Sequence, residues 1–288
     1  GNVLSRDSSG STPLHYAENV DLAQLLISFG ADVNALDEDG DTPLQMAVKH
    51  KCGDVAEYLI SKGCRVDIFS ISALGILDRI NDLLNEDIDL VRSVDSDHST
   101  PLHKACAWGQ VEAVKVLIER GADISAVDAK GRTPLHRAVE GGYWNVAGVL
   151  LSGGAKLDIF LASAMGLTDA TEKFLKAEPE IVHTKDAWGE EPLHHAARWG
   201  RTDLVRLLLK HGADINSKSE NEGWSPIMWA LMYDHQEVAS LLLEHDAILD
   251  SRDSLGLTPL QWAADRGKTA MVNFLVSKGA DICCQSTN

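Results

Sequence analysis

The sequence lacks long hydrophobic runs. No apolar stretch approaches the about 18 residues that a membrane-spanning helix needs. The N-terminus also lacks the basic and then apolar pattern of a secretion signal. Apolar residues nevertheless make up 44% of the 288 residues, which is enough to build a hydrophobic core. We therefore expect a folded, water-soluble chain that does not have a membrane as a partner.

Cysteine is scarce and irregularly placed. The five cysteines are Cys52, Cys64, Cys106, Cys283 and Cys284. They are odd in number and do not recur at a fixed spacing, as the disulfide framework of a secreted protein would. We therefore expect a cytoplasmic or otherwise intracellular protein. The adjacent pair Cys283–Cys284 allows a metal or redox site as one interpretation and an irregular tail as the other, and we favour the tail.

Basic residues are outnumbered. Lys and Arg total 26 against 43 Asp and Glu, so the formal net charge is −17. Contacts to nucleic-acid phosphates need a surplus of Lys and Arg, so the balance argues against nucleic acid as a partner and equally against anionic membranes. A strongly acidic surface favours association with a basic protein. The acidic segment Asp37–Asp41 is the clearest candidate for steering such a partner.

Sequence motifs of catalysis and cofactor binding are missing. There is no glycine-rich dinucleotide fingerprint, no P-loop, no H-E-x-x-H segment, no nucleophile elbow and no C-x-x-C pair. The carboxylates are scattered, so none forms a candidate acid–base pair. His194 and His195 are adjacent, so on a helix they cannot form an i,i+4 ligand pair. We therefore predict that the protein is not an enzyme and has no catalytic residue, cofactor or metal ligand.

What the sequence does contain is a repeated unit, most clearly between Thr100 and Arg132. Thr100 is a candidate helix N-cap, and Pro101 follows at the first helical position, where its missing N–H costs nothing. A short helix with one apolar side ends at Gly109, and a second amphipathic helix containing Leu117 follows. A helix pair this small cannot bury its apolar face alone, so each unit needs a similar neighbour on either side.

The T-P-L-H-x-A opening, the central glycine, the Leu/Ile-rich helix and the closing G-A-D segment resemble the ankyrin repeat. The openings recur in register over nearly the whole chain, at Thr12, Thr42, Thr100, Thr133, Glu191, Ser225 and Thr258. The resemblance implies an all-α solenoid of about nine helix-turn-helix units with β-hairpin fingers. It also implies that the His of each T-P-L-H segment hydrogen-bonds neighbouring loops.

The unit openings divide the chain into nine repeats after an irregular N-terminal segment. The expected segments are 1–11 (irregular), 12–41, 42–65, 66–99, 100–132, 133–156, 157–190, 191–224, 225–257 and 258–288, the last including the tail. The first repeat is short and resembles an N-terminal cap.

Two of the units depart from the pattern in the same way. A D-I-F segment beginning at Asp67 or Asp158 replaces T-P-L-H, and no finger precedes either unit. The starts at 42, 66 and 100 recur 91 residues later at 133, 157 and 191, so we infer a duplicated block of three units. Either the two fingers were lost without consequence, which we favour, or their absence leaves notches into which a partner fits.

Residues that the fold does not need give the candidate binding site. The resemblance implies that the fifth, eighth and ninth residues of a unit face the concave groove, and tryptophans also stand at finger tips. Trp, Tyr, Met and Arg are enriched in protein interfaces. The predicted partner-binding residues are Trp108, Arg137, Trp188, His195, Arg198, Trp199, Trp224, Trp229, Met232, Tyr233, Trp262 and Arg266. The alternative is that rings of neighbouring units stack on each other and only stiffen the groove.

Together these patterns predict a non-catalytic protein–protein interaction scaffold or adaptor. We expect a monomer that binds a protein partner through its concave face and finger tips, and the charge balance favours a basic partner. The alternatives from other classes are a binder of small molecules, an inhibitor of an enzyme, and the targeting arm of a larger protein.

Overall fold

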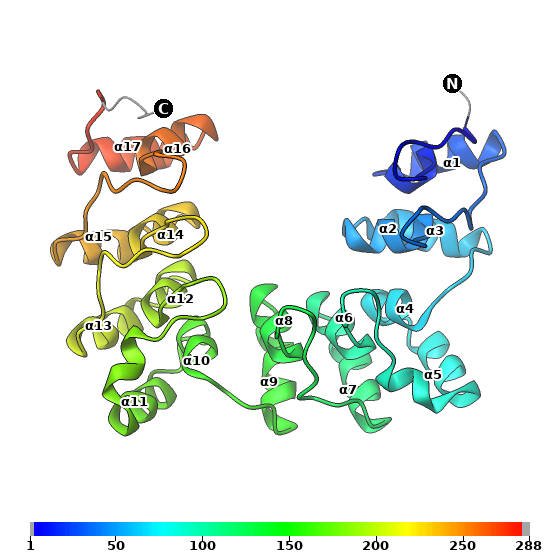
Figure 1. Cartoon of the computed structure of the whole chain (residues 1–288), viewed down its shortest axis with the longest axis horizontal. Helices are drawn as coiled ribbons and strands as arrows, with labels where there is room; N and C mark the ends of the chain where they lie inside the picture. The colour runs from blue at the N-terminus through cyan, green and yellow to red at the C-terminus, as the bar shows by residue number, and fades with distance from the viewer. Residues whose placement is uncertain (1–2, 284–288) are drawn as a thin grey trace. The chain divides into compact units, whose positions relative to one another are not determined.

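The computed structural model describes residues 3–283 and separates into two compact units. Unit 1 ends at Lys156 and unit 2 begins at Leu157. Within each unit, pairs of short helices follow one another in chain order (Figure 1). Among residues 3–283, none of the helices combines the length and the apolar character that crossing a bilayer requires.

Each helix pair of unit 1 consists of a short first helix and a longer second helix. The first helices are η1 (Pro13–Tyr16), α2 (Pro43–Lys49), α4 (Ile68–Leu74), α6 (Pro101–Ala107) and α8 (Pro134–Glu140). The second helices are α1 (Val20–Ser28), α3 (Gly53–Ser61), α5 (Leu77–Glu86), α7 (Val111–Glu119) and α9 (Trp144–Ser152). A 3₁₀ helix, η2 (Ile88–Arg92), follows α5.

Unit 2 is built in the same way. Its first helices are α10 (Ile159–Met165), α12 (Pro192–Arg198), α14 (Pro226–Met232) and α16 (Pro259–Asp265). Its second helices are α11 (Thr168–Ala177), α13 (Thr202–Lys210), α15 (Gln236–Glu244) and α17 (Thr269–Ser277). The 3₁₀ helix η3 (Pro179–His183) follows α11.

The core of each unit runs between successive helix pairs. In unit 1 the first helices pack side by side in the order η1, α2, α4, α6 and α8, and in unit 2 in the order α10, α12, α14 and α16. The Leu of the T-P-L-H segments is buried at each contact, as Leu102, Leu135 and Leu193 show, and Leu117 is buried behind them. Each layer therefore covers the apolar face of the next, as a repeat too small to fold alone requires.

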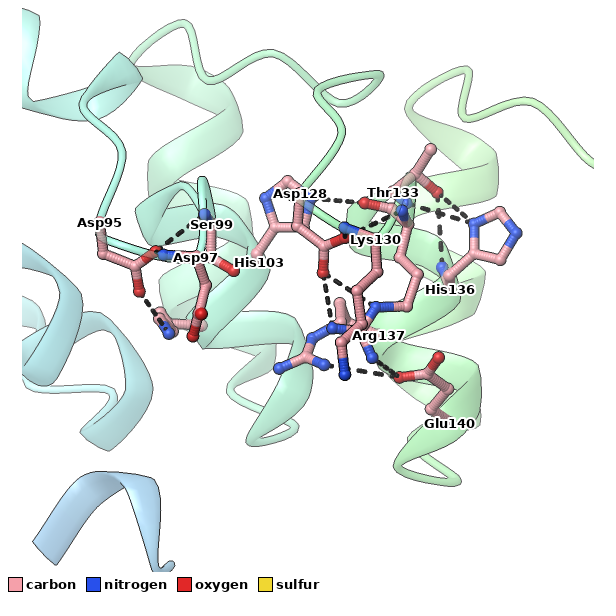
Figure 2. Close-up of polar contacts among 12 residues, drawn as sticks. Asp95, Asp97, Ser99, His103, Asp128, Lys130, Thr133, His136, Arg137 and Glu140 are labelled. Atoms are coloured by element: carbon pink, nitrogen blue, oxygen red, sulfur yellow. Dashed lines mark hydrogen bonds and ion pairs between the residues drawn. The ribbon is translucent and has the colours of Figure 1, made fainter. Parts of the chain in front are cut away.

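The T-P-L-H segments form the helix starts that the sequence predicts. Thr100 is the N-cap of α6, and its hydroxyl accepts a hydrogen bond from the His103 backbone N–H. His103 Nδ1 accepts from the Thr100 N–H at 3.1 Å, so Nε2 carries the ring proton and donates to the Arg132 carbonyl at 3.0 Å. His136 lies against Thr133 in the same way (Figure 2). The bridging role that the ankyrin resemblance gives this His is confirmed for His15, His103 and His194, whose Nε2 atoms reach carbonyls of the following loop.

The fingers are compact turns and not the expected β-hairpins, because none of residues 3–283 lies in a strand. In the finger Asp128–Arg132, Asp128 Oδ1 accepts from the backbone N–H groups of Lys130 and Arg132 at 2.9 and 3.0 Å (Figure 2). The fingers that begin at Asp7, Asp37, Asp95, Asp186 and Asp253 close in the same way. A carboxylate that satisfies two N–H groups completes the turn within five residues, which leaves no room for a strand ladder.

The finger Asp7–Ser11 is an ordered turn within the segment 1–11 that the sequence analysis expected to be irregular. Asp7 Oδ1 accepts from the N–H groups of Ser9 and Ser11, and the Glu38 N–H donates to the Ser9 carbonyl at 3.0 Å. The D-x-x-G-x pattern at Asp7 matches the pattern at Asp37. This match could have predicted a finger at residues 7–11 from the sequence. At the other end of the chain, Cys284 of the expected tail lies outside the described residues.

Helix positions repeat at the interval of 91 residues that the sequence gives for the duplicated block. Helix α4 begins at Ile68 and α10 at Ile159, and η2 and η3 begin at Ile88 and Pro179. Asp67 and Asp158 cap α4 and α10 by accepting a backbone N–H at 2.7 Å, so the D-I-F segments replace the Thr cap with an Asp cap.

Candidate partner-binding surface

One face of unit 2 carries a row of aromatic rings that we call the aromatic surface: Trp199, Trp224, Trp229, Tyr233 and Trp262. The rings belong to α14 and α16, to the residues that follow α12 and α14, and to the residue before the α14 N-cap. Trp199 stacks on Tyr233 with centroids 6.4 Å apart, and Tyr233 stacks on Trp229 at 6.1 Å. Trp224 lies 4.7 Å from Trp229 and 5.8 Å from Trp262. Aromatic contacts therefore run without interruption over three successive repeats.

Three cations lie over these rings. The Arg198 guanidinium is 4.5 Å from the Trp229 centroid and 5.5 Å from that of Tyr233. Arg266 lies over Trp262 at 4.7 Å, and Lys268 lies over the same ring at 5.1 Å. Cation–π attraction of this kind orders both the ring and the cation. Lys268 was not predicted from the sequence, because it lies beyond the repeat positions from which the candidates were taken.

The aromatic surface is partly solvent-accessible and partly internal. Tyr233 is 41% exposed and Arg266 is exposed, whereas Trp199, Met232 and Trp262 are half-buried. Trp229 is only 8% exposed, and its indole Nε1 is buried without a hydrogen-bond partner. That the fifth residue of this unit faces the concave groove stays a prediction, but little of the Trp229 ring is accessible there, because Trp224 packs over it. For Trp229 the alternative of ring stacking between repeats describes the structure better.

Trp108 and Arg137 lie in unit 1, each in a separate setting. Trp108 is half-buried at the end of α6, where it packs against the core and close to Gly53. Arg137 faces Glu140 at 3.6 Å on α8, and Glu140 also pairs with Arg132 at 3.3 Å (Figure 2). These ion pairs occupy the guanidinium groups that a partner would otherwise contact.

Trp188 lies in the finger Asp186–Glu190 of unit 2, and His195 lies on α12, the helix that follows this finger. The Trp188 carbonyl accepts from the Glu220 N–H at 3.1 Å, which ties two neighbouring fingers together. His195 Nε2 lies 2.9 Å from Asp186 Oδ2 and 3.6 Å from Glu190 Oε2. The side chains of His195, Asp186 and Glu190 are 14%, 10% and 4% exposed, respectively, so they form a largely buried cluster.

The two carboxylates of this cluster respond differently to burial. Burial raises the pKa of Glu190 above its usual range, although the nearby His195 opposes the change. Burial acts in the same direction on Asp186, but hydrogen bonds from His195 and from backbone N–H groups outweigh it and lower the pKa of Asp186.

The sequence alone did not connect Asp186 and Glu190 with His195. The corresponding residues 91 positions earlier are Asp95, Ser99 and Lys104, where Lys104 pairs with Asp95 at 2.5 Å. A comparison of the two copies of the duplicated three-unit block could have identified the cluster from the sequence. It shows that one copy carries an ordinary Lys–Asp ion pair, and the other carries a His with two carboxylates.

A second candidate surface lies in unit 1, between the fingers Asp37–Asp41 and Asp95–Ser99, and we call it the acidic notch. No finger precedes α4, and a depression opens beside this helix. Its lining includes four carboxylates, two amines and one aromatic ring: Asp39, Asp41, Asp67, Asp95, Lys49, Lys104 and Phe69. Because Lys49 pairs with Asp41 and Lys104 with Asp95, an excess of negative charge remains.

Charges across the notch act on Lys49. Burial lowers the pKa of Lys49, but the hydrogen bond and charge of Asp41, with Asp97 and Asp37 farther away, raise it overall. Asp97 belongs to the second finger, so the carboxylates of both fingers contribute to one negative potential.

Comparison with known proteins agrees with the helix pairs described above. The profile of the family described as "Ankyrin repeats (3 copies)" matches residues 2–70, 68–160, 159–253 and 217–286. Over 214 residues the chain is 30% identical to transient receptor potential cation channel subfamily A member 1 of Homo sapiens. That alignment covers 68% of this chain and 17% of the channel, so the chain spans about a sixth of the length of this relative.

Two solved structures also match part of the chain. The human ASB11 ankyrin repeat domain is 28% identical, with a TM-score of 0.47 over 75% of this chain and 99% of that domain. A chain of the Bdellovibrio bacteriovorus complex between the predatory endopeptidase Bd0816 and the immunity protein Bd3460 is 22% identical. Its TM-score is 0.46, over 62% of this chain and 98% of that one. Because the family profile matches along nearly the whole sequence, the chain belongs to the ankyrin repeat family.

Proposed function

We propose that the chain is a non-catalytic scaffold or adaptor that binds a partner protein. The contact would use the aromatic surface of unit 2, on the face that is concave in an ankyrin stack, together with the neighbouring finger tips. The observation that carries this proposal is the row of five aromatic rings, with exposed Tyr233 and Arg266 and half-buried Trp262. Exposed aromatic and Arg side chains that lie together are typical of interface hot spots.

The arrangement supports binding because the side chains are already ordered. Tyr233 is held between Trp199 and Trp229, and Arg198 lies over the Trp229 ring. Each rotamer-rich side chain that a complex must immobilise costs about 0.5–1.5 kcal/mol. Contacts made before binding reduce that cost, so the surface can bind with little rearrangement.

The acidic notch of unit 1 supports the proposal that the partner is basic. A Lys or Arg side chain entering the notch would meet Asp39 and Asp67 and could lie against the ring of Phe69. This contact would add electrostatic steering, which acts mainly on the association rate and weakens with salt.

We further propose an intracellular location. The thiols of Cys52, Cys64, Cys106 and Cys283 are free, and Cys64 and Cys106 are buried in the core. Burial raises the pKa of Cys64 to about 11, so this thiol is unreactive at neutral pH. Buried free thiols without a disulfide framework are compatible with a reducing compartment.

Affinity capture with mass spectrometry tests the proposed function. Wild type is compared with Tyr233→Ala/Arg266→Glu, which changes accessible side chains of the aromatic surface. The matched control is Val276→Ala/Lys278→Glu, on the second-helix side of the same unit. A partner retained by wild type and control but lost by the first variant supports the proposal, and a partner retained by all three contradicts it.

A further inference from the structure

The cluster of Asp186, Glu190 and His195 in unit 2 has the spacing of a metal coordination shell. The three potential ligand atoms all lie within 4.8 Å of one another. His195 Nε2 is 2.9 Å from Asp186 Oδ2 and 3.6 Å from Glu190 Oε2. In a tetrahedral zinc site with bonds of about 2.0–2.1 Å, ligand atoms are about 3.3 Å apart. The two separations from His195 lie on either side of that value.

We propose that Asp186, Glu190 and His195 bind a divalent transition-metal ion, with Zn²⁺ as the best chemical match. One imidazole and two carboxylates supply three protein ligands, and water takes the fourth position. This donor set fits zinc better than calcium, which takes six to eight oxygen ligands. The inference departs from the expectation, drawn from sequence motifs, that the chain has no metal ligand. It does not depend on the proposed partner-binding function.

The Glu190 carboxylate is the strongest sign of a missing ligand. It is 4% exposed, and its contact with His195, at 3.6 Å, is longer than a hydrogen bond. Among the described residues no hydrogen bond to this carboxylate is found. Burying a carboxylate without such partners is costly. A cation between Glu190 and His195 would remove that cost.

The other two ligands are already oriented. Asp186 Oδ1 accepts from the N–H groups of Trp188 and Glu190 at 2.8 and 2.9 Å, which leaves Oδ2 directed at His195. Hydrogen bonds to the far side of a ligand are what fix its orientation in metal sites. Asp186 and His195 are 10% and 14% exposed, so an ion can enter from solvent.

The charge of the cluster also favours a cation. With His195 protonated, the three side chains sum to one negative charge, and with neutral His195 they sum to two. A bound Zn²⁺ with neutral His195 brings this sum to zero. Arg198 and Glu222 are the other charged groups that act on Glu190, and their charges oppose each other. Ligation through Nε2 requires that nitrogen to carry no proton, so the bound cation would replace the hydrogen bond between His195 and Asp186.

The fold requires Asp186, which closes the finger, but not Glu190 or His195. The equivalent positions in unit 1 hold Asp95, Ser99 and Lys104, and that finger closes with the same backbone hydrogen bonds. Unit 1 therefore supplies substitutions that the framework accepts, namely Glu190→Ser and His195→Lys. Each removes one ligand and installs the residue found 91 positions earlier.

Zinc binding by the full chain tests the proposal. Protein stripped with chelator would be titrated with ZnCl₂ by calorimetry, and bound zinc would be counted by elemental analysis. The work would use a Cys283→Ser/Cys284→Ser background, so that the adjacent tail thiols cannot bind the ion. His98→Ala, in a finger of unit 1, serves as the histidine control, and circular dichroism of the metal-free variants checks their folding.

We expect one zinc per chain in this background and in His98→Ala. Glu190→Ser and His195→Lys should each lower the affinity by more than the about 10- to 100-fold that loss of an outer-shell partner costs. X-ray absorption should show only N and O ligands, including one imidazole. Failure to bind zinc, or equal binding by His195→Lys, would overturn the proposal and leave the cluster as an ion-pair network.

Discussion

Asp246 occupies a backbone position that glycine holds in other repeats, so Asp246→Gly should stabilise the protein. Asp246 follows α15 with φ of +67°, and the equivalent Gly212 and Gly279 have φ of +87° and +91°. A Cβ at Gly212 or Gly279 would meet no atom within 4 Å, so space does not distinguish the residues. The difference lies in the left-handed conformation, which suits glycine and strains most other residues.

The expected gain follows from three contributions. A left-handed conformation costs an L-residue roughly 1–2 kcal/mol, and Asp, which tolerates it better, is at the low end. Removing a carboxylate from a helix C-terminus gains about 0.3–1 kcal/mol. The extra conformational freedom of glycine in the unfolded chain lowers the free energy of unfolding by roughly 0.5–1 kcal/mol. Together these contributions give a net stabilisation of about 0.5–1 kcal/mol.

Urea denaturation followed by tryptophan fluorescence measures this effect, since the tryptophans of the aromatic surface report on α12, α14 and α16. The reciprocal change Gly212→Asp, one repeat earlier, should lower the free energy of unfolding by a similar amount. Ser240→Gly, in the middle of α15, should instead lower the free energy of unfolding by roughly 0.5 kcal/mol, because glycine is unfavourable inside a helix. If Asp246→Gly were destabilising, or Gly212→Asp neutral, the reasoning from backbone strain would be refuted.

Three further predictions concern pH, the core and charge. Burial lowers the pKa of His194 to about 4, below its unfolded value of about 6.5, so the unfolded chain binds the extra proton between these pH values. The free energy of unfolding should therefore fall by up to about 1.4 kcal/mol per pH unit as the pH drops from 6.5 to 4. In urea denaturation of His194→Gln over the same pH range, the free energy of unfolding should fall less steeply, because this contribution is absent. Leu117→Asp buries an unpaired charge and should abolish helical structure in neighbouring repeats; unchanged circular dichroism and melting would contradict the repeat register. Asp39→Asn/Asp97→Asn should slow partner association several-fold at low salt in stopped-flow measurements, and Glu57→Gln on α3 should not.

The sequence was sufficient for the repeat architecture because each unit carries its own boundary signals. Thr100 and Pro101 begin a helix, Gly109 ends it, and the structure places α6 at Pro101–Ala107. The register also predicted the buried position of Leu117. These are local effects of capping, backbone conformation and apolar periodicity, which a single sequence contains in full.

Contacts between repeats were harder to predict. Trp229 occupies a position that the repeat pattern directs outward, yet Trp224 packs over it and it is 8% exposed. Asp186 and His195 are nine residues apart and meet because a finger folds back beside α12. Side-chain packing between neighbouring layers decides both cases, and no periodicity within one repeat encodes it. The fingers also closed more tightly than β-hairpins, since Asp128 and its counterparts bind the turn backbone.

The central claim is that the aromatic surface binds a partner protein, and the most direct test is calorimetric titration of the captured partner. Tyr233→Ala/Arg266→Glu is compared with wild type and with Val276→Ala/Lys278→Glu. Hot-spot residues contribute about 2 kcal/mol or more, so the first variant should bind at least about 30-fold more weakly, and the control should bind like wild type. Equal affinity for all three proteins would show that the partner binds elsewhere.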